Sequence, residues 1–197
     1  MQLSFGWLDD IPDIAALARA ELPSMTTLHN DEGWRTHIRF GRGEEIFSNC
    51  TLVLRDSDAD NILVGFIWVD AAMYVDKRIV EPWWCINALA VNARYRRKGI
   101  GRGLVGEIEG IATATGVALL YGQSVAEAVP FWKAADYILA ADGEAVRTHA
   151  PAMLVSGERV VFTAEPGPGD RFFLKYLART PGSVRSGLLP VSVLNGG

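Results

Sequence analysis

The sequence is poor in the residues that metal and redox sites require. It has 2 cysteines and 3 histidines in 197 residues, and no two histidines have the spacing of metal ligands, so zinc chemistry is not expected. The same scarcity leaves a Ser-His-Asp triad without support. Cys50 and Cys85 both fall in apolar runs typical of strands. We therefore expect two buried free thiols in a reducing compartment, and neither a disulfide nor a nucleophile.

Long apolar runs are absent as well. No stretch of the chain reaches 18 apolar residues, which argues against a transmembrane helix. The N-terminus also lacks the basic and apolar segments of a secretory signal. These absences predict a cytoplasmic protein with no membrane contact. A hydrophobic content of 49% is nonetheless enough to build one good core.

A change in composition near the C-terminus predicts one domain over residues 1–179 and a tail over residues 180–197. The tail contains Pro181-Gly182 and Asn195-Gly196-Gly197, but its run from Leu188 to Leu194 is apolar. Three interpretations stay open for this run: it docks on its own domain, it docks on a partner subunit in a homodimer, or it frays as many termini do.

The charge of the chain is negative overall and positive in one place. The formal net charge is −4, while basic residues gather between Arg94 and Arg102. An acidic chain with one short basic segment suits a small anionic cofactor better than a long track of nucleic acid.

That basic segment lies in the most informative motif, which runs from Val91 to Leu104. An apolar run from Trp83 to Val91 leads into a glycine-rich turn, and helical periodicity follows. The pattern predicts a strand, a turn and a helix N-terminus, where free N–H groups and the helix dipole favour an anion. Gly99 and Gly101 would let a phosphate approach the backbone closely. We predict a ligand with a pyrophosphate or several phosphates.

The spacing of the glycines separates this motif from two other phosphate loops. The chain has no G-x-x-x-x-G-K-[ST] run, and Gly99-x-Gly101-x-Gly103 does not match the G-x-G-x-x-G of a dinucleotide-binding fold. The pattern present is Arg96-x-x-Gly99-x-Gly101, preceded by Leu89-Ala90-Val91. It resembles motif A of the GCN5-related N-acetyltransferase (GNAT) family, which binds acetyl-coenzyme A.

The order of expected elements resembles the same family from Leu3 to Ala178. Strands are expected over residues 2–8, 50–55, 62–70, 83–91, 117–121, 158–164 and 171–178. Helices are expected over residues 9–21, 31–47, 104–116 and 126–135. The resemblance implies an α/β GNAT acyl-CoA N-acyltransferase fold, with a mixed, mostly antiparallel central sheet flanked by helices.

The resemblance also implies a binding mode for acetyl-coenzyme A as cosubstrate. The backbone amides from about residue 97 to residue 102 would bind the pyrophosphate, and backbone groups of Leu89, Ala90 and Val91 would bind the pantetheine arm. The residues expected at the pyrophosphate are Arg96, Arg97, Lys98, Gly99, Ile100, Gly101 and Arg102. The implied activity is transfer of an acetyl group to a primary amine by direct attack, without a covalent enzyme intermediate and without a metal.

The chain departs from the family at the general acid. Members often carry an Asn-x-x-Ala-x-x-x-Tyr pattern whose tyrosine protonates the departing thiolate, and here Val125 and Trp132 take the Asn and Tyr positions. An indole N–H is no practical acid at neutral pH, and a positioned acid contributes about 10²–10⁴ in rate. Three alternatives stay open: another residue such as Tyr137 protonates the thiolate, water does so, or the enzyme is slow. Phe131 and Trp132 are expected to pack along the coenzyme.

Candidate catalytic residues at the acceptor end come from the strands expected over residues 62–70 and 83–91 and from the loop between them. Asp70 and Glu81 are candidate bases because they flank that loop. Asn87 lies in an otherwise apolar strand, so it either orients a water or substrate or makes a structural hydrogen bond. His37 either lines the acceptor site or is an ordinary surface histidine.

Three readings of the function stay open. The first is acetylation of a small-molecule or peptide amine. The second is the same fold with another acyl donor, or with a nucleobase or aminoacyl-tRNA as acceptor, although the negative net charge argues mildly against nucleic acid. The third is a catalytically weak coenzyme A-binding module with a regulatory or interaction role, which Trp132 in place of tyrosine supports.

Overall fold

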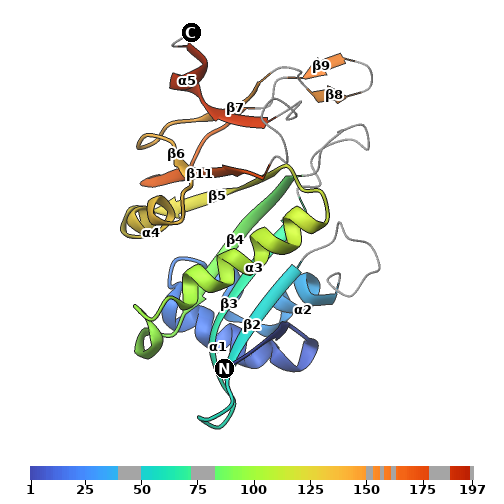
Figure 1. Ribbon diagram of the computed structural model, residues 1–197, viewed down its shortest axis with the longest axis vertical. Coiled ribbons are helices and arrows are strands. Elements are labelled where there is room, and N and C mark those ends of the chain that lie inside the picture. Colours follow the sequence, from blue (N-terminus) through green and yellow to red (C-terminus); the bar gives the residue numbers. More distant parts are fainter. Residues whose placement is uncertain are drawn as a thin grey trace. The chain divides into compact units, whose positions relative to one another are not determined.

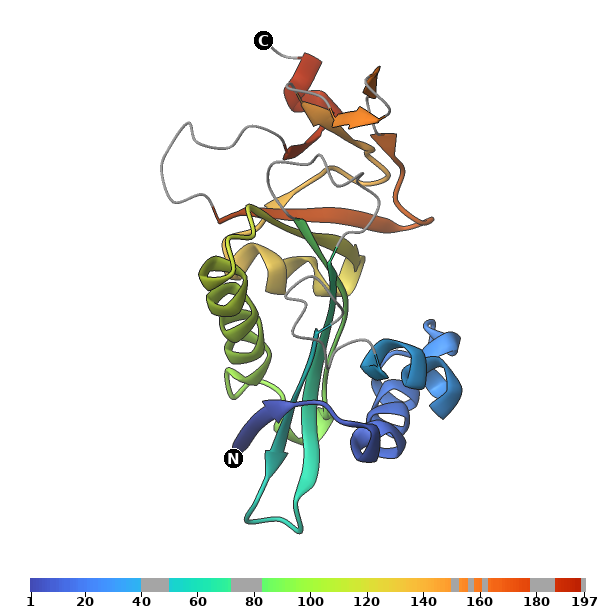
Figure 2. The same cartoon turned by 90° about the vertical axis from the view of Figure 1, so that its right-hand side faces the viewer.

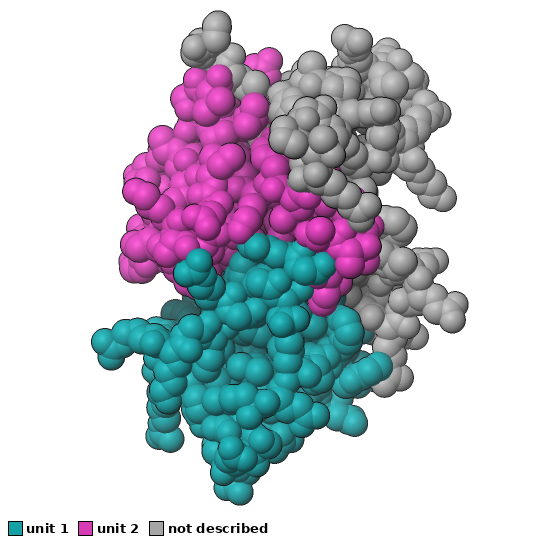
Figure 3. All heavy atoms as spheres, viewed as in Figure 1, with its two compact units in different colours: residues 1–71, 86–110 teal, residues 72–85, 111–197 magenta. Residues whose placement is uncertain are grey.

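The computed structural model describes residues 1–39, 50–71, 83–149, 153–155, 158–160, 163–177 and 187–195. The chain divides into two compact units, shown in teal and magenta in Figure 3. The first unit contains Met1–Ala71 and Ile86–Gly110, and the second contains Ala72–Cys85 and Ile111–Gly197. Strand β4 (Trp83–Val91) and helix α3 (Ile100–Ala114) contribute residues to both.

The first unit is built on a set of strands with helices on both faces. Its other strands are β1 (Gln2–Phe5), β2 (Cys50–Asp56) and β3 (Ile62–Ala71). Its other helices are α1 (Ile11–Glu21) and α2 (Asp31–Arg39), with short 3₁₀ segments η1 (Leu8–Asp10), η2 (Thr26–His29) and η4 (Ala93–Tyr95). Figure 2 shows α1 and α2 on one face of these strands and the start of α3 on the other.

The strands expected over residues 50–55 and 62–70 are confirmed, and an acid- and Asn-rich turn joins them as the β2–β3 hairpin. The strands pair antiparallel from Cys50↔Val69 to Asp56↔Ile62, with a register shift between Leu54 and Arg55. Asp60 and Asn61 turn the chain with φ of 51° and 56°. Short polar side chains tolerate this left-handed conformation better than other residues do, which explains why such a cluster forms the turn.

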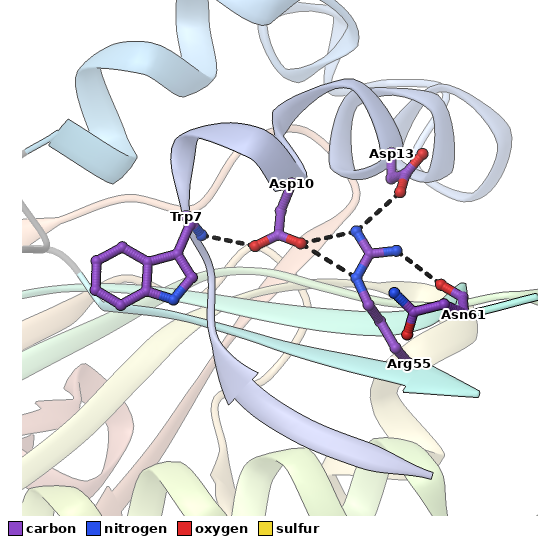
Figure 4. A network of polar contacts seen from close by, with 5 residues as sticks. All are labelled: Trp7, Asp10, Asp13, Arg55 and Asn61. Atoms are coloured by element: carbon purple, nitrogen blue, oxygen red, sulfur yellow. Dashed lines mark hydrogen bonds and ion pairs between the residues drawn. The ribbon is translucent and has the colours of Figure 1, made fainter. Parts of the chain in front are cut away.

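A polar network ties this hairpin to the start of α1 (Figure 4). The Arg55 guanidinium donates to Oδ1 of Asp10 at 2.7 and 3.1 Å, to Oδ2 of Asp13 at 2.8 Å and to the Asn61 carbonyl at 2.8 Å. Oδ2 of Asp10 accepts from the Trp7 N–H at 2.7 Å. The Asp10 side chain therefore connects the segment after β1 to strand β2, and it makes no capping hydrogen bond to α1.

The core of the first unit lies between the sheet and helices α1 and α2. Ile11, Ile14, Ala18 and Leu17 recur at helical spacing and are all buried, in agreement with the amphipathic pattern. Trp34 of α2 is fully buried, and its indole N–H donates to the Leu28 carbonyl at 2.7 Å. Further members of this cluster are Leu28, Ile38, Val53, Leu63, Phe66, Trp68, Ala88 and Ala90.

The second unit combines three small β arrangements with short helices. The start of β4 pairs parallel with β5 (Leu119–Val125), and β11 (Asp170–Tyr176) pairs antiparallel with β5 and with β6 (Ile138–Leu139). The remaining strands are β7 (Val146–His149), β8 (Met153–Val155), β9 (Glu158–Val160), β10 (Thr163–Ala164) and β12 (Gly187–Pro190). The helices are η5 (Ala126–Ala128), α4 (Val129–Ala134) and α5 (Val191–Asn195).

Among the described residues, seven strands hydrogen-bond in the order β1-β2-β3-β4-β5-β11-β6 (Figure 1). The β4–β5 pair is parallel, whereas β1–β2, β2–β3, β5–β11 and β11–β6 are antiparallel. The mixed, mostly antiparallel sheet flanked by helices that was expected from the sequence is thus confirmed.

Part of the C-terminal segment docks on the second unit. Strand β12 pairs antiparallel with β7, from Gly187↔His149 to Pro190↔Val146. The Val191 N–H donates to the Ala145 carbonyl at 3.1 Å, and the Ser192 N–H donates to Glu144 at 2.7 Å. Residues 187–195 therefore pack on their own chain, which was one of the three interpretations left open by the sequence.

Several predicted boundaries were wrong. The single strand expected over residues 158–164 is divided between β9, which pairs with β8, and β10, which pairs with β7. The strand expected over residues 117–121 runs from Leu119 to Val125, because Gln123 and Ser124 continue a ladder that β11 completes. Of the helix expected over residues 31–47, the part up to Arg39 is described, and residues 40–49 lie outside the described residues.

No helix in the part of the chain that the structure describes is long and apolar enough to cross a membrane. No group of three His, Cys, Asp or Glu side chains within the same ranges is placed to hold a metal ion. Cys50 and Cys85 are free thiols, each partly buried, and burial raises the pKa of the Cys50 thiol to about 12.

Candidate functional site

The turn between η4 and α3 places two residues in the left-handed region of backbone conformation. Arg97 has a φ of 61° and Gly99 a φ of 81°. The Gly103 N–H donates to the Gly99 carbonyl at 2.9 Å, so the first hydrogen bond of α3 starts at Gly99. Left-handed residues alternating with ordinary ones make successive N–H groups converge on one side, which creates a concave anion site. Glycine adopts the required φ without steric cost.

The N–H groups of residues 97–102 are available to a ligand. No residue that the structure describes accepts a hydrogen bond from any of them. Arg97, Lys98, Gly99 and Arg102 are exposed, and a Cβ atom added to Gly99 would meet nothing within 4 Å. Free N–H groups, the positive end of the α3 dipole and three basic side chains therefore meet at an open surface. A pyrophosphate fits this combination of donors and charge.

Contacts with β2, β3 and α1 fix the turn to the rest of the first unit. The Asn92 N–H donates to the Val64 carbonyl of β3 at 2.8 Å, and the Tyr95 hydroxyl donates to Asp56 at the end of β2 at 3.0 Å. Glu21, the last residue of α1, accepts from the Ala93 N–H at 2.8 Å and also bonds the Arg96 guanidinium. The turn is thus tied to two strands and a helix, so its N–H groups are held in place before a ligand arrives.

Arg96 is engaged by the protein itself. Besides Glu21, its guanidinium reaches the Val91 carbonyl, to which Nε donates at 3.1 Å. The sequence grouped Arg96 with the residues at the pyrophosphate. The structure gives its side chain a role in shaping the turn and leaves Arg97, Lys98 and Arg102 as the outward charges.

Strand β4 leads into the turn and alternates between core and less buried positions. Ala88 and Ala90 are buried in the core of the first unit, while Leu89 and Val91 are partly buried. Gly65 of β3 lies so close that a Cβ atom there would be 2.9 Å from the Ala90 carbonyl oxygen. The side chains of Ala88 and Ala90 therefore serve packing against the first unit.

A second set of polar side chains lies on β3 and β4, away from the turn. Asn87 Nδ2 donates to Oδ2 of Asp70 at 2.7 Å. Burial is the largest influence on this carboxyl and raises its pKa, against the opposing effects of Asn87 and then Trp68. The sequence had singled out both residues for the acceptor end, and the structure brings them into contact. The alternative of a structural hydrogen bond for Asn87 is therefore realised, with a candidate base as its partner.

His37 of α2 stacks on Trp68, which lies two positions before Asp70 on β3. Their ring centroids are 3.9 Å apart with a tilt of 38°, and Trp34 meets Trp68 edge-on at 5.6 Å. Burial lowers the pKa of His37, so its imidazole is neutral near pH 7. His37 is thus half-buried against an aromatic cluster and is not an isolated surface histidine.

The aromatic residues expected at the thiol end form a cluster inside the second unit. Trp132 is 5% exposed and stacks on Phe173 at a centroid distance of 3.7 Å. Tyr137 is buried too, edge-on to Trp132 and Phe173, with Lys175 Nζ 5.2 Å from its ring centroid. Phe131 is partly buried at 5.0 Å from Trp132. Phe131, Trp132 and Tyr137 therefore have the surroundings of core aromatics.

Glu81, the other candidate base, lies outside the described residues.

Sequence reasoning missed the residues that act through long-range contacts. Glu21 lies 75 positions before Arg96 and reads in the sequence as an ordinary last residue of a helix. Asp56, which holds Tyr95, reads as a turn acid. No local pattern marks either residue, because each contact depends on how β2, β3 and α1 are placed around the turn.

Comparisons with known proteins agree with this geometry. A sequence model of the acetyltransferase (GNAT) family matches residues 14–137. A comparison with curated proteins found no match. Among solved structures, the protein smu.2055 from Streptococcus mutans is 19% identical with a TM-score of 0.62, covering 90% of this chain and 100% of its own.

Two further structures have names that state an activity. A ribosomal-protein-alanine N-acetyltransferase from Brucella melitensis is 14% identical with a TM-score of 0.61, covering 89% of this chain and 99% of its own. An aminoglycoside 6'-N-acetyltransferase in complex with coenzyme A is 14% identical with a TM-score of 0.60, covering 92% of this chain and 99% of its own. At these identities the likeness concerns the fold.

Proposed function

The chain belongs to the GNAT acetyltransferase family, and on that premise we propose that it transfers an acetyl group from acetyl-coenzyme A to a primary amine. The observation that carries the proposal is the fixed turn before α3, whose N–H groups at residues 97–102 have no acceptor among the described residues. A ligand with a pyrophosphate supplies the acceptors that these groups lack.

The donor site in this proposal uses the first unit alone. The N–H groups of residues 97–102 bind the pyrophosphate, and Arg97, Lys98 and Arg102 add positive charge around it. Backbone groups of Leu89, Ala90 and Val91 then bind the pantetheine arm as it runs back along β4. Glu21 and Arg96 act as positioning residues. Trp132 is left out, because its indole is enclosed by the core of the second unit.

In this mechanism the protein mainly positions the reacting groups. Acetyl-coenzyme A, when bound, supplies an acetyl group on a thioester that an uncharged amine can attack directly. The residues of β4 hold the reacting groups together, which lowers the entropic cost of the encounter. A backbone N–H aimed at the thioester carbonyl stabilises the charge that develops there. The amine needs a group that accepts its proton, and the Asp70–Asn87 pair at the far end of β3 and β4 offers a carboxylate.

Calorimetric titration tests the donor. We expect micromolar binding of acetyl-coenzyme A and coenzyme A to the wild-type chain. Titration of 3′-dephospho-coenzyme A, which keeps the pyrophosphate, should show binding weakened by less than about 10-fold, since the turn is assigned to the pyrophosphate. A thiol-release assay with a panel of amines then tests transfer. Absence of binding to all three coenzyme A species would refute the proposal.

The hydrogen bonds from the Ala93 N–H and the Arg96 guanidinium to Glu21 give a further prediction. In Glu21→Ala the Ala93 N–H and the Arg96 guanidinium both lose their partner, which should cost about 1–3 kcal/mol of stability. We also expect the Kd of acetyl-coenzyme A to rise about 3- to 10-fold, because the N–H groups are no longer held in place. Calorimetry and thermal unfolding measure the two effects.

Glu21→Gln is the matched variant for this prediction. Its amide oxygen can still accept from the Ala93 N–H, so both effects should be smaller than in Glu21→Ala. Equal acetyl-coenzyme A affinity in the wild type and in Glu21→Ala would show that the turn keeps its shape without the hydrogen bonds to Glu21.

A further inference from the structure

Strand β1 lies at one end of the seven-stranded order, and only β2 pairs with it among the described residues. All four of its residues, Gln2–Phe5, are exposed. Edge strands are usually protected by charged side chains, by proline or by a covering segment, because their free backbone groups can pair with another chain. Residues 1–8 contain no charged side chain and no proline. Strand β1 is therefore an edge that lacks these common protections.

The register with β2 determines which backbone groups of β1 face outward. Gly6 continues the pairing, since its N–H donates to the Thr51 carbonyl at 2.8 Å. In an antiparallel pair, residues that bond the neighbouring strand alternate with residues that do not, so Ser4 bonds β2 as Gly6 does. The N–H and C=O groups of Leu3 and Phe5 therefore point away from β2. No residue in the described ranges is bonded to these outward groups.

The side chains of Leu3 and Phe5 make the same edge apolar. Leu3 lies opposite Leu54 of β2, and Phe5 lies opposite Leu52. Residues that are directly opposite each other share a face of the sheet, so the four side chains lie on one face. Leu52 is buried, whereas Leu3 is 39% exposed and Phe5 is 52% exposed. An apolar surface therefore extends from β2 to the outward edge of β1, where both hydrogen-bonding groups and apolar side chains meet solvent.

We propose that β1 pairs antiparallel with β1 of a second copy of this chain, across a two-fold axis that passes between the two Ser4 residues. Under this symmetry, Leu3 of one copy lies opposite Phe5 of the other. The outward N–H groups of each copy then donate to the outward carbonyls of the other. Each Leu3 side chain packs against a Phe5 side chain across the axis. The edge of β1 is thus complementary to itself in both its hydrogen bonds and its side chains.

Charge and area support a second copy as the occupant of this edge. The chain has a formal net charge of −4, so two copies repel each other on average, and an uncharged edge avoids that cost. The C-terminal strand β12, which the sequence analysis considered for a dimer contact, pairs with β7 of its own chain. Two paired edges of four residues each bury less than the about 1,200 Å² of a standard interface. We therefore expect a weak dimer with a Kd of about 10–100 μM.

Two double variants, compared by sedimentation equilibrium, test the pairing. Leu3→Lys/Phe5→Glu and Leu3→Glu/Phe5→Glu remove the same apolar side chains, both from exposed positions. In the proposed dimer the first places opposite charges across the axis and the second places like charges there. We expect the first to dimerise within about 10-fold of the wild type, and the second to dimerise at least about 10-fold more weakly than the first. Ile138→Glu, at an exposed apolar residue of β6, should leave the dimer unchanged.

A disulfide across the axis gives a second, independent test. The two Ser4 residues would face each other as a non-hydrogen-bonded pair with Cα atoms about 4.5 Å apart, a separation that a disulfide spans. We expect Ser4→Cys to form a covalent, reducible dimer in oxidised glutathione. Gln2→Cys places the thiol on the same face of β1, but the two copies would lie about 14 Å apart along the strands, so it should stay monomeric. The wild type, with Cys50 and Cys85 as its free thiols, gives the background level of crosslinking.

Three results would overturn the inference. They are a wild-type chain that stays monomeric up to about 500 μM, equal dimer Kd values for the two double variants, and crosslinking of Gln2→Cys as efficient as that of Ser4→Cys. Thermal unfolding checks that every variant is folded, and the Ser4→Cys test does not depend on the charge variants. The outcome is also separate from the proposed function. A dimer that binds no coenzyme A species would refute only the acetyl transfer, and a monomer that binds acetyl-coenzyme A would refute only the pairing of β1.

Discussion

Gly99→Glu is expected to weaken acetyl-coenzyme A binding by at least about 100-fold. The new carboxylate would stand where the free N–H groups of residues 97–102 meet, and a like charge placed against a ligand costs several kcal/mol. The backbone adds to the loss, because Gly99 has a φ of 81° and side chains raise the energy of this conformation by about 1–2 kcal/mol. Isothermal titration calorimetry measures the change in Kd.

Two further glycine variants separate charge from conformation. Gly99→Ala adds the conformational cost without the charge, so its effect on the Kd should be clearly smaller. Gly110→Glu makes the same change on an exposed helix position where an added Cβ atom meets nothing within 4 Å. It lies about 16 Å further along α3, beyond a Debye length at physiological salt, so the Kd should change by less than about twofold. Equal losses of acetyl-coenzyme A affinity in Gly99→Glu and Gly110→Glu would show that the coenzyme does not bind at the turn before α3.

The turn could be predicted from the sequence because the information for it is local. A strand, a glycine-rich basic segment and a helix start follow one another without interruption from Trp83 to Ala114, and each imposes its own conformation. The free N–H groups then arise from helix geometry itself, since the first residues of any helix lack intrahelical acceptors. The family resemblance rested on this segment, and the match over residues 14–137 agrees with it.

The acceptor end could be predicted only as a set of separate candidates. Asp70 and Asn87 were each singled out, but their contact depends on how β3 lies against β4, which a pattern of apolar residues does not fix to one position. Trp68 reads as one more core aromatic, because nothing in the sequence tells whether its N–H finds a partner. Burial decides that question, and burial is a property of the folded chain.

The second unit was predicted least well. Its strands β6, β8, β9 and β10 have two or three residues each, which is too short for the alternation that identifies a strand. The strand β12 follows a Pro-Gly pair and a serine-rich stretch that read as a tail. Trp132 shows the limit of reasoning by position within a family. It takes the place of a reactive tyrosine in the motif, yet the structure uses its ring as the partner of Phe173.

Arg55→Met is expected to destabilise the fold by about 2–3 kcal/mol. Arg55 joins the β2–β3 hairpin to the start of α1 through three hydrogen bonds to Asp10 and Asp13, and a fourth reaches the Asn61 carbonyl within the hairpin. The Arg55 side chain is 15% exposed, as is that of Asp10. Breaking a buried pair costs about 3–5 kcal/mol, because the remaining charge loses its partner. Partial exposure lets water replace some of the loss. For a chain of this size the melting temperature should fall by about 5–10 °C.

A double-mutant cycle decides whether the pairing itself is responsible. Asp10→Asn alone leaves Arg55 with Asp13 and the Asn61 carbonyl, so it should cost less than Arg55→Met. The double variant should cost clearly less than the sum of the two, since each single change removes the same contact. Arg55→Lys keeps the charge but loses the planar guanidinium with its paired donors. Its stability should therefore lie between that of the wild type and that of Arg55→Met. Arg94→Met, at an exposed arginine, should change stability by less than about 0.5 kcal/mol. Additive losses in the cycle would mean that the packing of the Arg55 stem, and not its ion pair, joins the hairpin to α1.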